Sequence, residues 1–236
     1  IVETIDVIVS PNGIRNFCHI RGSIDVKSFL SGDPLCKLVL SHSPHAEDVV
    51  YHRCVETDAQ GAMVIPFRPP DGPFTLMRYR ITGSDTTLPL WILPHFVWAK
   101  GSVTFDITAK PEISLNNPIE EMDVRLELPS GVGSPTLTTT EGRAVFETSS
   151  REVIWSVPGF SRKDPIFLRG SASTDAGFDL AGRFPIVTAK FTVNGMSTSG
   201  IQIDRLQVDN VDYVPTKGVK FITKAGSYEF RTGLYS

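Results

Sequence analysis

Apolar and polar residues alternate along most of this chain, and this pattern constrains the fold more than any other feature. Successive side chains of a strand point to opposite faces of a sheet, so an apolar residue at every second position buries one face. The pattern predicts roughly fifteen or more short strands, rich in β-branched and aromatic residues. The clearest segments are Ile5–Val9, Ile20–Phe29, Met63–Phe67, Met77–Ile81, Val103–Ile107, Val124–Leu128, Val145–Val157 in two pieces, Ile186–Val193 and Ile201–Val208.

Turn-forming residues separate these segments, and helix signals are weak. The 17 prolines and 19 glycines interrupt any helical pattern, and Ala46–Val50, a single turn, is the best helix candidate. Asn-Gly and Asp-Gly pairs favour the positive φ angles of tight turns. We therefore predict an all-β sandwich, with too many strands for one simple sandwich and enough for two. The predicted turns are Pro11-Asn12-Gly13, Ser31–Pro34, Asp71-Gly72, Glu141-Gly142, Asn194-Gly195 and Ala225-Gly226.

Composition and cysteine usage narrow the class of protein. The net charge of −3 argues against non-specific nucleic-acid binding, although a local basic patch stays possible. No run approaches the roughly 18 apolar residues that a membrane span needs. Cys18, Cys36 and Cys54 are an odd number without a CxxC pair, so we interpret them as reduced core cysteines of a cytosolic or nuclear protein, with one disulfide as the alternative. Because the chain opens at Ile1 without Met and inside an alternating pattern, we expect residues upstream of it.

We considered several residues as catalytic or metal-ligating, and we interpret them more simply as parts of turns. His42 and His45 lie near Glu47 and Asp48, but in a loop that contains proline, so we interpret them as a polar turn and predict no metal site. Asp71, before a glycine, is typical of a turn rather than of a catalytic carboxylate. No GxSxG, P-loop or GxGxxG motif occurs. We therefore predict no catalytic residues and no cofactor, and we find no motif for an enzyme or a carbohydrate-binding β-sandwich.

Several longer motifs resemble one family, the medium (mu) chains of clathrin adaptor complexes. The segment Ile65–Arg80, with Pro69-Pro70-Asp71-Gly72 at its centre, is close to the family's "FxPPDGxFxLMxYR" and is the most specific. The ending Lys217–Thr232 is closer to AP-3 medium chains than to those of AP-1 and AP-2, which carry Trp at Gly218 and Arg at Lys220. The other matching segments are Ser10–Gly13, Gly22–Pro34, Tyr51–Val55 and Ser199–Ile201.

The resemblance implies an elongated fold of two β-sandwich subdomains, with the second inserted into the first. Residues 1–98 with 199–236 would form the first subdomain, which binds sorting signals, and residues 99–198 the inserted one. It also implies that the chain recognises Tyr-x-x-Φ signals, where Φ is a bulky apolar residue, in cytosolic tails of transmembrane cargo. The peptide would add to the edge of a strand, and pockets would take its alternate side chains.

Partners and location follow from the same resemblance. The full-length protein would assemble with two large adaptor subunits and one small one, and it would associate peripherally with Golgi and endosomal transport vesicles bound for the lysosome or vacuole. No nucleic acid is expected. The alternative is a mu-homology scaffold domain, of the muniscin, stonin or coatomer delta type, that recruits other trafficking factors without a tyrosine pocket.

The resemblance assigns six residues to peptide binding. Ile203, Leu206 and Val219 match the lining of the Φ pocket, although ordinary core is the alternative for each. Lys27 and Lys220 match the cationic residues beside the signal tyrosine, where their aliphatic stems can pack on the ring. Gly218 would leave a wider floor than an indole does. The family's tyrosine pocket also uses a Phe-x-Asp that falls immediately before Ile1.

Two features of this region follow from the residues themselves. Apolar parity switches between Ile203 and Leu206, which predicts a bulge near Asp204–Arg205, in the strand that matches the family's peptide-pairing strand. The basic residues Lys217, Lys220, Lys224 and Arg231 suggest either contact with anionic lipid or, more simply, a mixed surface around the groove.

Overall fold

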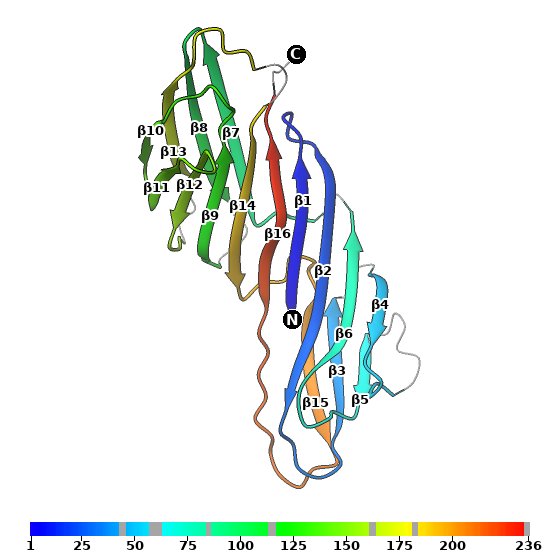
Figure 1. Ribbon diagram of the computed structural model, residues 1–236. Coiled ribbons are helices and arrows are strands. Elements are labelled where there is room, and N and C mark those ends of the chain that lie inside the picture. Colours follow the sequence, from blue (N-terminus) through cyan, green and yellow to red (C-terminus); the bar gives the residue numbers. More distant parts are fainter. Residues whose placement is uncertain are drawn as a thin grey trace. The chain divides into compact units, whose positions relative to one another are not determined.

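The computed structural model describes residues 1–42, 46–56, 63–83, 86–112, 117–160, 164–180 and 184–233. Every regular element among them is a strand, which confirms the predicted all-β class (Figure 1). We find in this part of the chain no helix with the length and apolarity that crossing a membrane requires.

The described residues form sixteen strands. The first eight are β1 (Val2–Val9), β2 (Arg15–Ser28), β3 (Leu35–His42), β4 (Glu47–Tyr51), β5 (Val64–Phe67), β6 (Gly72–Thr82), β7 (Leu90–Ala99) and β8 (Ser102–Pro111). The others are β9 (Ile119–Glu127), β10 (Thr136–Thr139), β11 (Arg143–Glu147), β12 (Glu152–Val157), β13 (Ile166–Ser173), β14 (Ile186–Asn194), β15 (Gln202–Asp209) and β16 (Ile222–Arg231).

The chain forms two compact units, and neither is continuous in sequence. Unit 1 comprises Ile1–Ile5, His19–Thr86 and Gly195–Thr223; unit 2 comprises Asp6–Cys18, Thr87–Asn194 and Lys224–Ser236. The limits fall within β1, β2 and β16, so each of these strands contributes one part to each unit. The subdomain boundaries predicted from the sequence lie elsewhere, near residues 98 and 199, and they stay a prediction.

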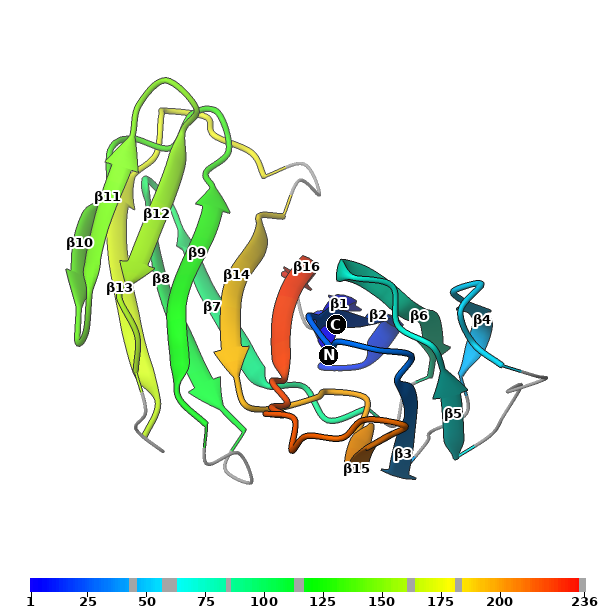
Figure 2. The same ribbon diagram turned by 90° about the horizontal axis from the view of Figure 1, so that it is seen from below.

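Unit 1 contains two sets of hydrogen-bonded strands. β1, β2, β6 and β4 are neighbours in one sheet, and β15, β3 and β5 form another. Alternation explains the pairing of β2 with β6: Ile20 faces Ile81, and Ile24 faces Met77, with all four side chains buried. Figure 2 shows β15, β3 and β5 in the lower right of the view. β15 ends its sheet, so one of its edges has no strand of the described residues beside it.

Unit 2 also contains two sheets. Its larger sheet has the order β11-β12-β9-β14-β16, followed by parts of β1 and β2, and its smaller sheet has the order β10-β13-β8-β7. Buried side chains alternate with more accessible ones along several of these strands, as at Val103, Phe105 and Ile107 on β8. Trp155 of β12 is fully buried, and its indole N–H donates to the Glu141 carbonyl oxygen over 2.8 Å. Unit 2 is thus a closed sandwich of apolar faces.

Most predicted turns are confirmed by positive φ angles, but one predicted turn is wrong. Gly13 has φ 79° and Gly72 has φ 85°. In contrast, Ala225-Gly226 lies inside β16 instead of forming a turn, because flanking apolar residues such as Tyr228 and Phe230 are buried there. The best helix candidate, Ala46–Val50, is not helical: Glu47–Tyr51 is strand β4, paired with β6.

The cysteines and histidines carry no metal or disulfide chemistry among the described residues. The three thiols are free; Cys18 and Cys36 are buried and Cys54 is half-buried. No group of three or more potential metal ligands comes together in the described ranges. His45, one of the two histidines considered for a metal, lies outside those ranges.

Candidate functional site

β15 carries an irregularity at the position that the sequence predicts. Ile203 pairs with Leu40 and Arg205 with Val39, so Asp204 has no partner on β3. This confirms the bulge. Because one extra residue reverses the side-chain alternation, Ile203 and Leu206 both reach the same groove in spite of their odd spacing.

This groove lies in unit 1 and has a volume of about 770 Å³. Its walls come from the first residues of β1, from β2, from β15 and from the irregular segment between β15 and β16, which Figure 1 draws as a long thread without arrows. The structure brings all six sequence-predicted site residues together in it: Lys27, Ile203, Leu206, Gly218, Val219 and Lys220.

The apolar part of the groove leaves its side chains partly accessible. Ile203 and Leu206 are half-buried, and the side chain of Val219 is 48% exposed. Beneath them, Cys36 and Phe67 are buried and contribute to the lining. Burial raises the pKa of the Cys36 thiol, which therefore stays neutral and behaves as a small apolar group. A bulky aliphatic side chain would find apolar contacts on several sides here.

Three exposed lysines lie along the same groove. The ammonium group of Lys27 sits 5.2 Å from the centroid of the Phe29 ring, a cation–π contact. The Lys217 Nζ donates to the Leu206 carbonyl oxygen over 3.0 Å, and so covers an acceptor of β15. Lys220 is exposed and also lines the groove. Their long stems add apolar surface while the charges stay in water.

Asp25 supplies a negative charge to the lining. Its two carboxylate oxygens each accept a hydroxyl, from Thr75 and from Ser23, both over 2.8 Å. These bonds hold the carboxylate on β2, two residues before Lys27. The groove therefore combines apolar walls with charges of both signs.

The segment before β16 presents unpaired backbone. The Ile1 nitrogen donates to the Lys220 oxygen over 2.7 Å, and Ile222 donates to the Ile1 oxygen over 2.9 Å. Further back, the backbone groups of residues 217–219 form no hydrogen bond with any other described residue. At Gly218 an added Cβ would have no atom within 4 Å. Exposed donors and acceptors of this kind can pair with an added strand.

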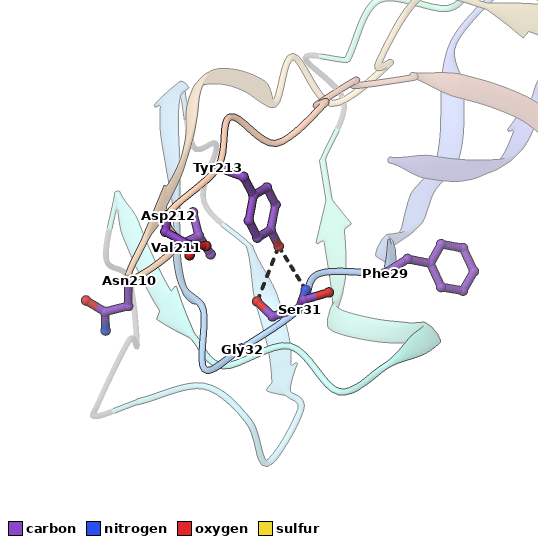
Figure 3. A pocket seen from close by; sticks show the side chains of 7 residues that line it. All are labelled: Phe29, Ser31, Gly32, Asn210, Val211, Asp212 and Tyr213. Atoms are coloured by element: carbon purple, nitrogen blue, oxygen red, sulfur yellow. Dashed lines mark hydrogen bonds between the residues drawn. The ribbon is translucent and has the colours of Figure 1, made fainter.

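A second, smaller hollow adjoins the groove and shares Phe29 and Tyr213 with it. Figure 3 shows the Tyr213 side chain directed at the turn that contains Ser31. The Ser31 N–H donates to the Tyr213 hydroxyl over 2.8 Å, and this hydroxyl lies 3.3 Å from the Ser31 carbonyl oxygen, to which it donates. Phe29 remains 68% exposed, and Val214, next to Tyr213, is 96% exposed. These bonds fix one end of the segment that closes the groove.

Sequence reasoning missed several lining residues. Val214 and Tyr213 lie in a stretch without alternation, so no periodic signal marks them. Phe29 ended a predicted strand, and nothing in the pattern shows that its ring faces solvent. Ile1 and Asp25 belong to alternating segments, and their contribution becomes visible only when β1 and β2 are placed beside the segment that ends at Lys220.

Comparisons with known proteins agree with this fold. The chain is 30% identical to the rat (Rattus norvegicus) AP-3 complex subunit mu-1, over 98% of this chain and 56% of the relative, so it spans about half the length of the curated relatives it matches. The structure resembles the zebrafish (Danio rerio) Fcho1 mu homology domain with bound Eps15 peptide, with a TM-score of 0.73, 14% identity, and coverage of 99% of this chain and 95% of that one.

A second structural neighbour is a homology model of the full-length AP-3 complex. Its TM-score is 0.73 at 20% identity, over 97% of this chain and 66% of that one. Both neighbours share the fold. The family model of the adaptor complexes medium subunits matches residues 1–232, nearly the whole chain. We conclude that this chain is a mu-homology domain and belongs to the adaptor complexes medium subunit family, a family of trafficking adaptors and not of enzymes.

Proposed function

We propose that this chain is the cargo-recognition domain of an AP-3-like medium subunit, and that its groove binds Tyr-x-x-Φ signals in cytosolic tails of membrane proteins. One observation carries the proposal: the six residues predicted from sequence, spread from Lys27 to Lys220, line a single groove. In this assignment Ile203, Leu206 and Val219 receive the Φ side chain. Lys27 and Lys220 flank the tyrosine.

Backbone pairing would hold the peptide in an extended form. The sequence analysis matched β15 to the pairing strand. However, the Lys217 ammonium already occupies the Leu206 carbonyl oxygen on β15. The unpaired groups of residues 217–219 are the better edge, and we propose that the peptide adds there. Burying one tyrosine and one leucine gains only a few kcal/mol before ordering costs, so a Kd on the order of micromolar is expected.

The cellular setting follows from the similarity to AP-3 medium subunits. The full-length protein would join two large subunits and one small subunit, and it would reach Golgi and endosomal vesicle membranes through that complex. Weak, reversible capture suits such a role, because cargo must be released after transport to the lysosome or vacuole.

Calorimetry with matched peptides tests the proposal. A Tyr-x-x-Leu peptide should bind, and its Tyr→Ala and Leu→Ala partners should bind at least about tenfold more weakly, since each loses one buried side chain. Leu206→Ser should weaken binding of the parent peptide. Leu93→Ser is the matched control, because Leu93 is 48% exposed on β7 and lies outside the groove. Equal heats for all three peptides would refute tyrosine-signal recognition and favour the scaffold alternative.

A further inference from the structure

A carboxylate occupies a core position in β1. Residues Glu3, Ile5, Val7 and Val9 share one face of this strand, and the side chain of Glu3 is fully buried, like its apolar neighbours. No described basic side chain forms an ion pair with it. Taking a charge out of water is costly unless hydrogen bonds compensate it. The partners of Glu3 therefore show what this carboxylate does.

Hydrogen bonds from two directions converge on Glu3. The Tyr79 hydroxyl of β6 donates to Glu3 Oε1 over 2.6 Å. On the other side, the Ser199 backbone N–H donates to Glu3 Oε2 over 2.9 Å, and the Ser199 hydroxyl donates to Oε1. Burial, then the charge of Glu3 and its hydrogen bond, raises the pKa of Tyr79, so this hydroxyl keeps its proton and stays a donor. Each carboxylate oxygen is thereby satisfied.

The neighbouring sequence is adapted to this arrangement. Gly22 of β2 pairs directly with Tyr79, and a Cβ added at Gly22 would meet the Tyr79 ring at 2.0 Å. Only glycine lets the ring lie across β2 and reach Glu3. Gly22, Tyr79 and Ser199 come from three separate motifs that the sequence analysis singled out, and none of them lines the groove. Their meeting point is Glu3.

Ser199 belongs to the loop that leads into β15. Its hydroxyl oxygen accepts the Ile201 N–H over 3.1 Å, which fixes the entry to the strand. The same loop is held on another side by Thr198, whose hydroxyl donates to Thr223 of β16 over 3.1 Å. Glu3 therefore ties the start of β15 to β1. The groove residues nearest to these anchoring points are Val2, which follows Ile1 and precedes Glu3 in the chain, and Ile203, four residues after Ser199.

We propose that Glu3 is a positioning residue for the groove: its buried carboxylate holds the entry of β15 at Ser199, and thereby sets the distance between the wall formed by Ile203 and Leu206 and the wall formed by Ile1. This inference rests on the proposed peptide function. Glu3 contacts no peptide itself. It acts on affinity and on the choice of the Φ residue through the placement of β15.

Glu3→Gln keeps the shape of the side chain and removes one acceptor. Whichever way the amide turns, either the Ser199 N–H or the Tyr79 hydroxyl loses its oxygen, because the amide nitrogen is a donor. The matched control is Ile20→Ala, which opens a cavity at a fully buried site of β2 that does not line the groove. Ser199→Ala removes only the hydroxyl bonds and should show a smaller effect of the same kind.

Two measurements separate positioning from general destabilisation. In Glu3→Gln, the affinity for a Tyr-x-x-Leu peptide should fall about tenfold, with a reduced preference for Leu over Ala at Φ. Amide hydrogen exchange at Ile201 and Ile203 should be faster than in Ile20→Ala. Ile20→Ala should lower the melting temperature and keep both affinity and preference. Peptide binding in Glu3→Gln equal to that in Ile20→Ala would overturn the inference.

A failure of the proposed peptide function would give a different result from a failure of the role proposed for Glu3. If the unaltered chain binds no Tyr-x-x-Leu peptide, tyrosine-signal recognition is wrong, and hydrogen exchange alone decides the role of Glu3. Faster exchange at Ile201 and Ile203 in Glu3→Gln than in Ile20→Ala then supports the placement of β15 by Glu3. Equal exchange in the two variants refutes it.

Discussion

The sandwich of unit 2 and the groove of unit 1 use the same alternating apolar pattern with opposite results. In unit 2, Leu126 and Trp155 are fully buried against other strands of the same chain. In unit 1, Ile203 and Leu206 stay half-buried, and Val219 is about half exposed. Clustered apolar side chains that remain accessible mark a binding surface. The difference shows that alternation predicts which face of a strand is apolar. Only the structure shows whether other parts of the same chain bury that face.

The largest expected contrast comes from one substitution made in both regions. Leu126→Ala should lower the free energy of unfolding by about 2–5 kcal/mol, because it leaves a cavity in a closed core. Leu206→Ala should cost less than about 1.5 kcal/mol, since its side chain is already half accessible. Chemical denaturation measures both. Similar losses at the two sites would mean that the groove residue is ordinary core.

A smaller effect is expected at Gly218, where the groove has free space. Gly218→Trp should leave stability within about 0.5 kcal/mol, because an added Cβ there meets no atom within 4 Å. The indole would offer an aromatic surface to the signal tyrosine, worth about 0.5–1.5 kcal/mol of binding. Calorimetry should therefore show tighter binding of Tyr-x-x-Leu. The gain should vanish with the Tyr→Ala peptide, and a gain that persists would place the indole elsewhere.

The smallest expected effect concerns Lys220. Lys220→Arg should strengthen binding of the tyrosine peptide about two- to threefold, because a planar guanidinium stacks on an aromatic ring better than an ammonium group does. The same exchange at Lys190, an exposed lysine of β14 outside the groove, should change nothing. An equal gain at both positions would point to a general charge effect instead of stacking.

Alternation and motifs made much of the fold predictable. β-branched runs such as Ile186–Val193 locate their strands, and Pro11-Asn12-Gly13 locates a turn. The turn predicted at Ala225-Gly226 was wrong because turn-forming residues express only a local preference. Burial of Tyr228 and Phe230 overrides that preference in β16. The strand at Glu47–Tyr51 was missed because its side chains lie mostly in solvent and carry no alternation.

Some residues of the candidate site were likewise predictable from the sequence, and others were not. Parity reversal at Ile203 and Leu206 predicted the bulge, because a bulge changes a one-dimensional pattern. Phe29 and Tyr213 left no such trace, since they come together through chain folding alone. Glu3, in contrast, has a signal in the sequence, because an acidic residue at the same alternating positions as Ile5, Val7 and Val9 indicates a buried carboxylate. Its partners at Tyr79 and Ser199, however, are distant in sequence.

Amide hydrogen exchange with and without a Tyr-x-x-Leu peptide tests the central claim most directly. The account predicts that the peptide protects the amides of Gly218, Val219 and Lys220, where the added strand pairs, and slows exchange in β15. The amides of Val103 and Phe105, in the sandwich of unit 2, should exchange as they do without peptide. Its Tyr→Ala partner should give no such protection. Peptide-dependent protection that leaves residues 217–220 unchanged would contradict the account.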